Sequence, residues 1–533
     1  MKIRFLALFL FTIGFVHADD YPKNESIDIK HYKFRLELND TTDIISGQAT
    51  IQLRVLKTVT DFELDLINQN NQKKGMAVSR VVMQEKELKY THQNNRLKIF
   101  LPDPASANEN LTLTIDYNGV PADGLIISKN KYGDRTFFGD NWPDRARNWL
   151  PCIDHPYDKA GVDFIVVAPL HYMVVGNGIK LEESYLNATQ KITHWHEAVN
   201  LPTKVMVIGV ARFAVQYVAE TNNIPIESWV YPQNRTEGFN DYAPAHPILE
   251  FFQKQIGPYP YKKLANVQST TRYGGMENAS NIFYFESSVT GKGGIEDLIA
   301  HEIAHQWFGN SVSEKDWHHV WLSEGFATYF AHTYSEFAYG KEKLNEELKS
   351  TRRQVINYCK KSAAPIINTT ITDYTQLLTT HVYQRAGWVL HMLRREIGEE
   401  AFWNGIREYY LTFQNGNALT SDFQHIMEKA SDKNLGNFFK QWLERVEIPS
   451  LKVSWAYVKK SQSLELIIEQ TQPGNPFDLQ LEIGIMGNNQ LQQVETVKIS
   501  GKSLKTSIPV KFSPEKLVLD PNTNLLFEDI SKN

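Results

Sequence analysis

The sequence predicts an α+β multidomain protein with an N-terminal β-sheet domain, a mostly helical central domain and a C-terminal β-sandwich. Three observations support this fold class. The chain has 533 residues. A single hydrophobic core rarely extends beyond about 250–300 residues, so several domains are expected. Apolar residues alternate with polar ones towards both ends but recur at helical spacing in the middle. With 42% hydrophobic and 22% charged residues, the composition is that of folded globular proteins.

Residues 19–225 form the predicted N-terminal β domain. Apolar side chains occupy every second position in short runs, as in Tyr32, Phe34 and Leu36, and polar turn residues at 39–42 close this run. Such period-two runs between turns are typical of strands with one buried face.

Residues 226–445 form the predicted helical domain. Three long segments have helical spacing, and two of them end at a glycine, a residue that commonly terminates helices. The segments are 295–310, 320–339 before Gly340, and 383–396 before Gly398.

Residues 446–533 form the predicted β-sandwich. Alternation returns at Leu451, Val453 and Trp455 and continues in further short runs separated by Gly, Asn and Pro. No large C-terminal helical domain is expected.

Residues 1–18 have the pattern of a signal peptide. Lys2 and Arg4 precede an apolar stretch at 5–16, and Ala18 supplies the small residue expected at a cleavage site. The apolar stretch is too short to span a bilayer core of about 30 Å. We therefore expect an exported chain, periplasmic or secreted, without membrane insertion after signal cleavage. An uncleaved interfacial anchor is the alternative.

Charge and cysteine content exclude several other classes. A formal net charge of -5 gives no general attraction to nucleic acid or to an anionic membrane, so neither partner is expected. Cys152 and Cys359 are the only cysteines, so the chain does not depend on a disulfide framework, and whether they pair is open. The sequence does not indicate an oligomeric state.

The segment His301-Glu302-Ile303-Ala304-His305 predicts a metal site. Two histidines four residues apart lie on one face of a helix and can reach one ion, and this pattern is typical of zinc. The helix is apolar almost all round, so these polar side chains would be buried and would need partners. The alternative is a pair of core histidines bonded to backbone carbonyls.

A catalytic zinc usually has three protein ligands, so one Zn²⁺ per chain requires a third donor. Glu324 is the candidate, because it is a carboxylate in the next, strongly apolar helical segment. A solvent-facing helix glutamate is the alternative. Glu302 is the predicted general base, which takes a proton from water and passes it to the leaving amine.

Three motifs in order make the chain resemble the aminopeptidase N and leukotriene hydrolase family of gluzincin metallopeptidases. They are Gly274-Gly275-Met276-Glu277-Asn278, the HEIAH segment, and Glu324 after eighteen intervening residues. The resemblance runs from about residue 28 to 450. It implies a thermolysin-like central catalytic domain and a zinc aminopeptidase that acts on peptides with a free N-terminus.

The resemblance also implies roles for residues outside the metal motif. Glu277 would hold the α-ammonium of the substrate, with Gly274, Gly275, Met276 and Asn278 as its neighbours at the substrate. Tyr383, in Val382-Tyr383-Gln384-Arg385, would stabilise the oxyanion. An ammonium removed from water needs a compensating carboxylate, which agrees with the role of Glu277.

The match weakens at two places. Many relatives have a second acceptor for the amine in the β domain, but ungapped counting places Trp142 there, with Asn141 and Asp140 as the nearest substitutes. Many relatives also end in a helical domain that covers the active site, and none is predicted here, so wider access is expected.

Three alternative functions stay open. The first is an epoxide hydrolase like the leukotriene-processing member of the family. That activity uses a carboxylate eight residues before the catalytic tyrosine, and this sequence has Thr375 there. The second is a zinc-containing peptide-binding scaffold without catalysis. The third is an endopeptidase, because a zinc helix does not decide which bond is cut.

Overall fold

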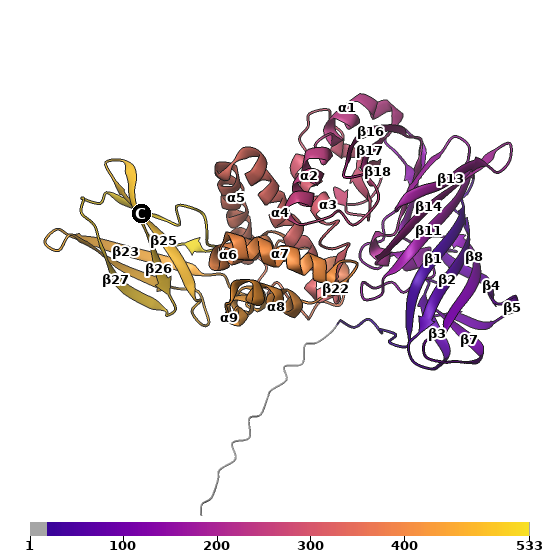
Figure 1. Ribbon diagram of the computed structural model, residues 1–533, viewed down its shortest axis with the longest axis horizontal. Helices are drawn as coiled ribbons and strands as arrows, with labels where there is room; N and C mark the ends of the chain where they lie inside the picture. Colours follow the sequence, from indigo (N-terminus) through magenta and orange to yellow (C-terminus); the bar gives the residue numbers. More distant parts are fainter. Residues whose placement is uncertain (1–18, 532–533) are drawn as a thin grey trace, which may run out of the picture.

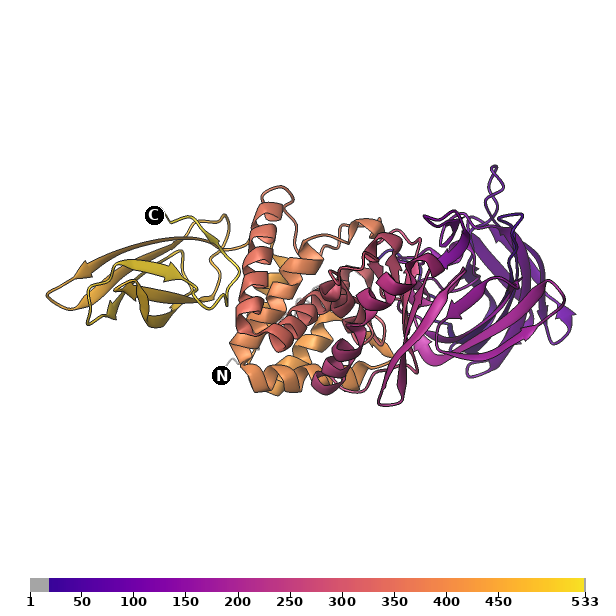
Figure 2. The same cartoon turned by 90° about the horizontal axis from the view of Figure 1, so that it is seen from above.

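The computed structural model describes residues 19–531, so the predicted signal peptide lies outside the described residues. Three bodies follow one another along the long axis of the molecule (Figure 1). The N-terminal sheets lie at one end, the helices in the middle and a small sandwich at the other end. Figure 2 shows the same order from above. The predicted α+β multidomain layout is confirmed.

The N-terminal domain is built from one eight-stranded, one four-stranded and one three-stranded sheet. The eight-stranded sheet has the order β13-β14-β11-β1-β2-β8-β4-β5. Buried and exposed positions alternate along β1 and β2, as the sequence pattern requires for strands with one buried face. The strands of the three sheets together are β1 Ile27–Glu37, β2 Ile45–Val55, β3 Val59–Asp65, β4 Gly75–Met83, β5 Lys86–Glu87, β6 Lys89–Gln93, β7 Arg96–Ala105, β8 Asn110–Val120, β9 Leu125–Lys129, β10 Arg135–Gly139, β11 Ala160–Pro169, β12 Met173–Gly176, β13 Ile179–Tyr185, β14 Gln190–Leu201 and β15 Ile208–Ala211.

The central domain begins with a mixed five-stranded sheet of order β16-β17-β18-β20-β19. Its strands are β16 Ala214–Thr221, β17 Ile224–Val230, β18 Leu264–Ser269, β19 Gly275–Met276 and β20 Asn281–Phe285. The predicted boundary at residue 225 therefore falls inside β17, and the sheet begins at Ala214. Periodicity reveals a strand but not the sheet it joins, which is why the pattern placed β16 with the preceding domain.

Nine α-helices complete this domain, of which α3 and α4 pack closely against each other. Their bounds are α1 Arg235–Tyr242, α2 Ala245–Gln255, α3 Glu296–Ala304, α4 Trp321–Tyr339, α5 Lys341–Cys359, α6 Ala386–Ile397, α7 Glu399–Phe413, α8 Thr420–Ser431 and α9 Gly436–Phe439. A short parallel pair, β21 Val312–Glu314 and β22 Gly416–Ala418, lies beside them.

The predicted helix ends are confirmed at two glycines and corrected elsewhere. Gly340 and Gly398 follow α4 and α6 with positive φ of 91° and 90°. The predicted helix 295–310 is shorter, because α3 stops at Ala304 and the chain turns back at Gly309 with φ 117°. The segment predicted to begin at residue 383 starts as a π-helical turn, His381–Arg385, before α6.

Two buried lysines of the N-terminal domain bind the central domain. Lys159 donates to the backbone oxygens of Asn310 and Ser311 at 2.9 and 2.8 Å. Lys204 pairs with Glu314 at 2.6 Å. Because buried charges are costly without partners, these contacts fix how the two domains meet around the segment between α3 and α4.

The C-terminal body is the predicted sandwich of two sheets, β27-β24-β23-β29 and β26-β25-β28. Its strands are β23 Ser450–Val458, β24 Ser463–Gln470, β25 Leu479–Gly487, β26 Gln490–Ile499, β27 Ser503–Pro509, β28 Lys516–Leu519 and β29 Glu528–Asp529. Cys152 and Cys359 are both free. Among the residues described, no helix is long and apolar enough to cross a bilayer.

Candidate active site

The centre of the candidate site lies between α3 and α4. His301 and His305 lie one turn apart at the end of α3, and Glu324 lies in the first turn of α4. The two Nε2 atoms are 3.1 Å apart, and Glu324 Oε2 lies 3.5 Å from His301 Nε2 and 3.3 Å from His305 Nε2. The structure therefore brings all three predicted ligands to one point.

These distances fit a tetrahedral zinc ion. Ligand atoms about 2.0–2.1 Å from a tetrahedral centre are separated from each other by about 3.3 Å. The three measured separations lie on either side of that value. The donor set of two imidazoles and one carboxylate is also one that catalytic zinc uses, with a further position left for water.

Contacts to Nδ1 fix the orientation of the His305 ring. Its Nδ1 lies 3.1 Å from the backbone oxygen of Phe308 and 3.1 Å from Ser323 Oγ, so Nε2 is left for a metal. A Cβ on Gly309 would lie 2.2 Å from Ser323 Oγ, so the turn after α3 requires glycine at this position. Local sequence therefore sets the geometry of a ligand.

Burial and neighbouring charges shift the pKa values of the site in opposite directions. Burial raises the pKa of Glu302 well above its usual value, and the charges of Glu277 and Glu324 add to this increase. Burial acts the same way on Glu324, but the imidazoles of His305 and His301 outweigh it and hold its pKa below the usual range. The site thus makes Glu302 the stronger proton acceptor and favours the ionised form of Glu324.

The segment predicted to meet the substrate lies against the same cavity. Glu277 is 5% exposed, and its Oε1 has no hydrogen-bond partner. Its backbone oxygen accepts hydrogen bonds from Gln306 Nε2 at 2.8 Å and Asn310 Nδ2 at 2.6 Å. The backbone of Glu277 is therefore held in place, and one oxygen of its carboxylate is left free to accept a hydrogen bond.

The other residues of this segment differ in what they do. A Cβ on Gly275 would lie 2.1 Å from Glu302 Oε1, so glycine is required for the carboxylate to stand there, whereas Gly274 has open space beside it. Met276 lines the cavity with Glu277. Asn278 is fully buried and lines neither this cavity nor the adjoining one.

Tyr383 reaches the site from the π-helical turn before α6. Its ring stacks on that of His301, with centroids 6.0 Å apart, and it lines the same cavity as Glu277 and Glu302. Burial raises the pKa of its phenol well above the usual value, and the nearby carboxylates raise it further. The phenol is therefore a hydrogen-bond donor at neutral pH.

Arg385 anchors this turn. It is fully buried and donates to the backbone oxygens of Arg445 and Glu447 at 2.7 and 3.0 Å. The segment that leads into the C-terminal sandwich is thereby bound to the turn that carries Tyr383.

Tyr273 and Leu378 line the cavity but were not predicted from the sequence, and Trp142, which ungapped counting had reached, lines it as well. Trp142 occupies the place where the second amine acceptor was sought, and its indole N–H can only donate. Asn141 instead donates to the backbone oxygens of Thr203 and Met206, and Asp140 pairs with Arg145. Neither substitute faces the cavity. Tyr273 directly precedes the Gly274-Gly275 motif, which is the one sequence signal that pointed to it.

A second hollow adjoins the site. It has a volume of about 510 Å³ and runs from Gly274 and Gly275 past Tyr383 to α4 and α5, where Thr328, His332 and Glu347 line it. His301, Glu302 and Tyr383 line both hollows, so the candidate site adjoins this groove.

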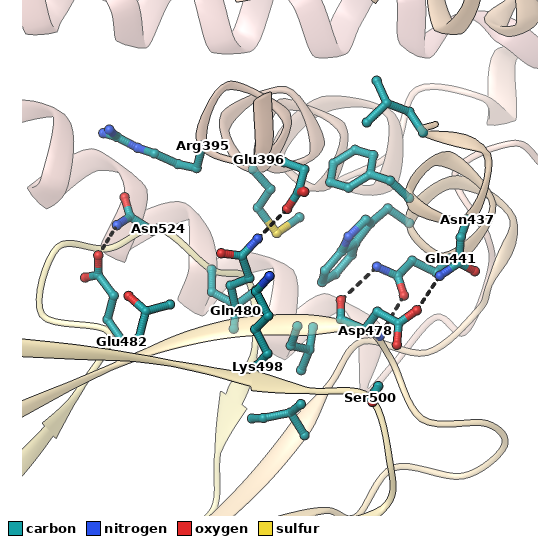
Figure 3. Close-up of a pocket in the computed structure, with 18 of the residues that line it drawn as sticks. Arg395, Glu396, Asn437, Gln441, Asp478, Gln480, Glu482, Lys498, Ser500 and Asn524 are labelled. Atoms are coloured by element: carbon teal, nitrogen blue, oxygen red, sulfur yellow. Dashed lines mark hydrogen bonds between the residues drawn. The ribbon is translucent and has the colours of Figure 1, made fainter. Parts of the chain in front are cut away.

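Another cavity, of about 620 Å³, lies between the central domain and the sandwich (Figure 3). Its carboxylates already have partners. Glu396 accepts from Gln480 at 2.8 Å, Asp478 from Asn437 at 2.5 Å and Glu482 from Asn524 at 2.9 Å. These paired groups belong to the contact between the two domains and form no catalytic cluster.

A second group of histidines and a carboxylate lies on the outer face of the eight-stranded sheet. Asp163 of β11 lies 2.6 Å from His31 Nε2 of β1, and 2.6 and 3.0 Å from His194 Nε2 and His196 Nδ1 of β14. The carboxylate is buried, whereas the three rings are partly exposed. We call these four residues the sheet cluster.

Comparison with known proteins places the site within a family. Residues 29–205 match the peptidase M1 N-terminal domain, and residues 242–442 match the peptidase family M1 domain. The two models fall on the two domains that meet at the site.

Several curated relatives match over the same region. Rat (Rattus norvegicus) aminopeptidase N is 26% identical over 62% of this chain and 38% of its own length. Probable aminopeptidase 2 of Sulfurisphaera tokodaii is 28% identical over 58% of this chain and 41% of its own. Mitochondrial aminopeptidase 2 of Saccharomyces cerevisiae is 25% identical over 80% and 47%. The chain thus spans less than half the length of these relatives. Because both domain models match in order and meet at the metal-ligand cluster, the chain belongs to peptidase family M1.

Proposed function

We propose that this chain is a zinc-dependent aminopeptidase that removes N-terminal residues from peptides, with one zinc ion per chain held by His301, His305 and Glu324. The observation that carries the proposal is the buried, unpartnered carboxylate of Glu277 beside this ligand cluster. A fixed carboxylate there favours an ammonium over a continuing peptide chain, which limits cleavage to the first peptide bond. The names of the relatives agree with this activity.

The residues of the site have different roles in the proposed reaction. When bound, zinc would supply a Lewis acid that polarises a carbonyl and makes water more acidic. Glu302 takes a proton from the attacking water and delivers it to the departing amine. Its raised pKa suits a group that must hold this proton between the two transfers. Tyr383 donates a hydrogen bond from its phenol to the carbonyl oxygen as negative charge develops there.

We further propose export of the chain with cleavage after Ala18, and therefore a periplasmic or extracellular site of action on peptides. The pattern of residues 1–18 supports this. The groove from Gly274 to α5 offers room for the rest of a peptide.

The decisive test is hydrolysis of alanyl and leucyl amide reporters and of their N-acetylated forms by the purified chain. We expect cleavage of the free-amine forms alone, loss of activity on chelation and recovery with zinc. The variant Glu302→Gln should retain zinc and lose about 10²–10⁴-fold in kcat. Equal cleavage of acetylated reporters would indicate an endopeptidase, and zinc binding without any cleavage would indicate a peptide-binding scaffold.

A further inference from the structure

Asp19, the first residue described, lies on the central domain. In Figure 1 the indigo start of the described chain lies near β22 and outside the sheets of its own domain. The backbone nitrogen of Asp19 donates to Asp316 Oδ2 at 2.7 Å. Its side chain accepts from the backbone nitrogen of Trp317 at 3.0 Å and contacts His155 Nε2 at 2.8 Å. Asp19 is 7% exposed and Asp316 is 4% exposed.

Two buried carboxylates thus lie close together. The cationic side chain nearby is Lys23, 3.3 Å from Asp19 Oδ1 and 3.5 Å from Asp316 Oδ2. His318 also faces Asp316, at 3.3 Å. Asp19 Oδ1 is buried, and its one neighbouring charge is the Lys23 ammonium, which does not form a hydrogen bond with it. A single lysine thus lies between two buried carboxylates, so a further positive charge at this place would be stabilised.

We propose that cleavage between Ala18 and Asp19 creates an α-ammonium that binds in a receiving site built by Asp316, and that this ion pair locks the N-terminal domain onto the central domain. The inference rests on the proposed export of the chain.

Cleavage changes the charge but not the position of the Asp19 nitrogen. Hydrolysis breaks the C–N bond, places the oxygen of water on the new carboxylate of Ala18 and leaves the nitrogen protonated. The ammonium has three N–H donors, so it can bond Asp316 Oδ2 and also satisfy its own Oδ1. A charge-assisted hydrogen bond at 2.7 Å is roughly twice as strong as a neutral one.

The receiving site is connected to the catalytic residues. Asp316 caps the short 3₁₀ turn Trp317–His319, accepting from the backbone nitrogen of His318 at 3.0 Å, and α4 with Glu324 follows this turn. Trp317 packs edge-on against Trp142, with ring centroids 5.7 Å apart, and Trp142 lines the cavity. Processing of the leader therefore stabilises the segment that positions a metal ligand.

The test compares a chain that begins at Asp19 with one that begins at Ala18, each with and without Asp316→Asn. All four carry Glu302→Gln, so that the extra alanine is not removed by the protein itself. We expect the extra residue to lower Tm by about 2–6 °C when Asp316 is present. In the Asp316→Asn background the same extension should have little effect. Asp20→Asn is the matched control, because Asp20 is exposed, and it should leave the difference unchanged.

Labelling of the α-amine gives a second measurement that does not depend on the variants being equally stable. At neutral pH an amine-reactive reagent should modify Asp19 of the folded chain about tenfold more slowly than Ala18 of the extended chain, because pairing with a carboxylate raises the pKa of the amine. Equal Tm values for the two chains, additive effects of extension and Asp316→Asn, or rapid labelling of Asp19 would each overturn the proposal. So would an exported chain whose measured mass does not begin at Asp19. None of these readouts requires peptide hydrolysis, so they fail independently of the proposed aminopeptidase activity.

Discussion

The active-site cluster, which consists of His301, His305 and Glu324, and the sheet cluster combine the same types of residue in different geometries. In the active site, two imidazole nitrogens and a carboxylate oxygen lie 3.1–3.5 Å from one another, so all three surround a common point. In the sheet cluster, three imidazoles each approach one carboxylate at 2.6–3.0 Å. The first spacing leaves room for an ion, whereas the second is that of direct hydrogen bonds.

The difference shows that composition alone does not define a metal site. Two histidines four residues apart on a helix lie on the same face and can reach one point, whereas adjacent strands of a sheet bring side chains into direct contact. The sheet cluster accordingly fits a stabilising ion-pair network on a solvent-facing surface, and the active-site cluster fits a metal. The predictions below test this contrast.

The largest effect is expected from exchanging a histidine in either cluster. His305→Ala should lose zinc and lower kcat/KM more than about a thousandfold, since both the metal and its chemistry are lost. His194→Ala should keep both. Metal analysis by mass spectrometry and assays on leucyl amide reporters measure the two effects. Loss of metal from the His194→Ala protein would make the sheet cluster a metal site as well.

Tyr383→Phe should lower kcat by about 10²–10³-fold without loss of zinc, because one oxyanion donor is removed. Tyr358→Phe is the control, since Tyr358 lies outside both hollows of the site. A mainly raised KM with unchanged kcat would assign Tyr383 to substrate binding instead.

The active site has a carboxylate oxygen without a partner, at Glu277. Glu277→Gln should lower kcat/KM on free-amine reporters about 10- to 100-fold, as expected for a charged hydrogen bond. Activity on N-acetylated reporters should stay as low as before. Glu286→Gln serves as the control, because Glu286 lines neither hollow of the site. An unchanged preference for free amines would rule out Glu277 as the anchor.

The smallest effect is expected from Asp163→Asn, which removes the centre of the sheet cluster. Although burial opposes it, hydrogen bonds from His31, His194 and His196 hold the pKa of Asp163 below its usual range. A lowered folded-state pKa stabilises the fold above the unfolded value of about 4, and this stabilisation is lost as pH falls through the folded pKa.

The variant should therefore be less stable by about 1–3 kcal/mol at pH 7, and the difference from the unchanged chain should shrink as pH falls below about 4. Denaturant unfolding across pH measures it, with Asp103→Asn, at an exposed position, as the control. A difference that is constant with pH would show that ionisation of Asp163 is not the cause.

Sequence patterns predicted the order of the three bodies, and several residues predicted for the site lie together in the structure. These lie where one element sets the spacing, as on α3, or where a motif is contiguous, as around Glu277. They did not place β16 or find Leu378, because sheet membership and cavity walls depend on contacts between distant segments. Counting along the chain did reach Trp142, but only the structure shows that Asn141 and Asp140 are engaged elsewhere.

The burial of Asp19 against Asp316 also affects how copies of this protein act on one another. An enzyme that removes N-terminal residues from peptides meets the N-termini of other copies of itself. With Asp19 7% exposed, the processed chain would present no free end for a neighbour to take. Mutual trimming would then be prevented by the fold itself, and no inhibitor would be needed.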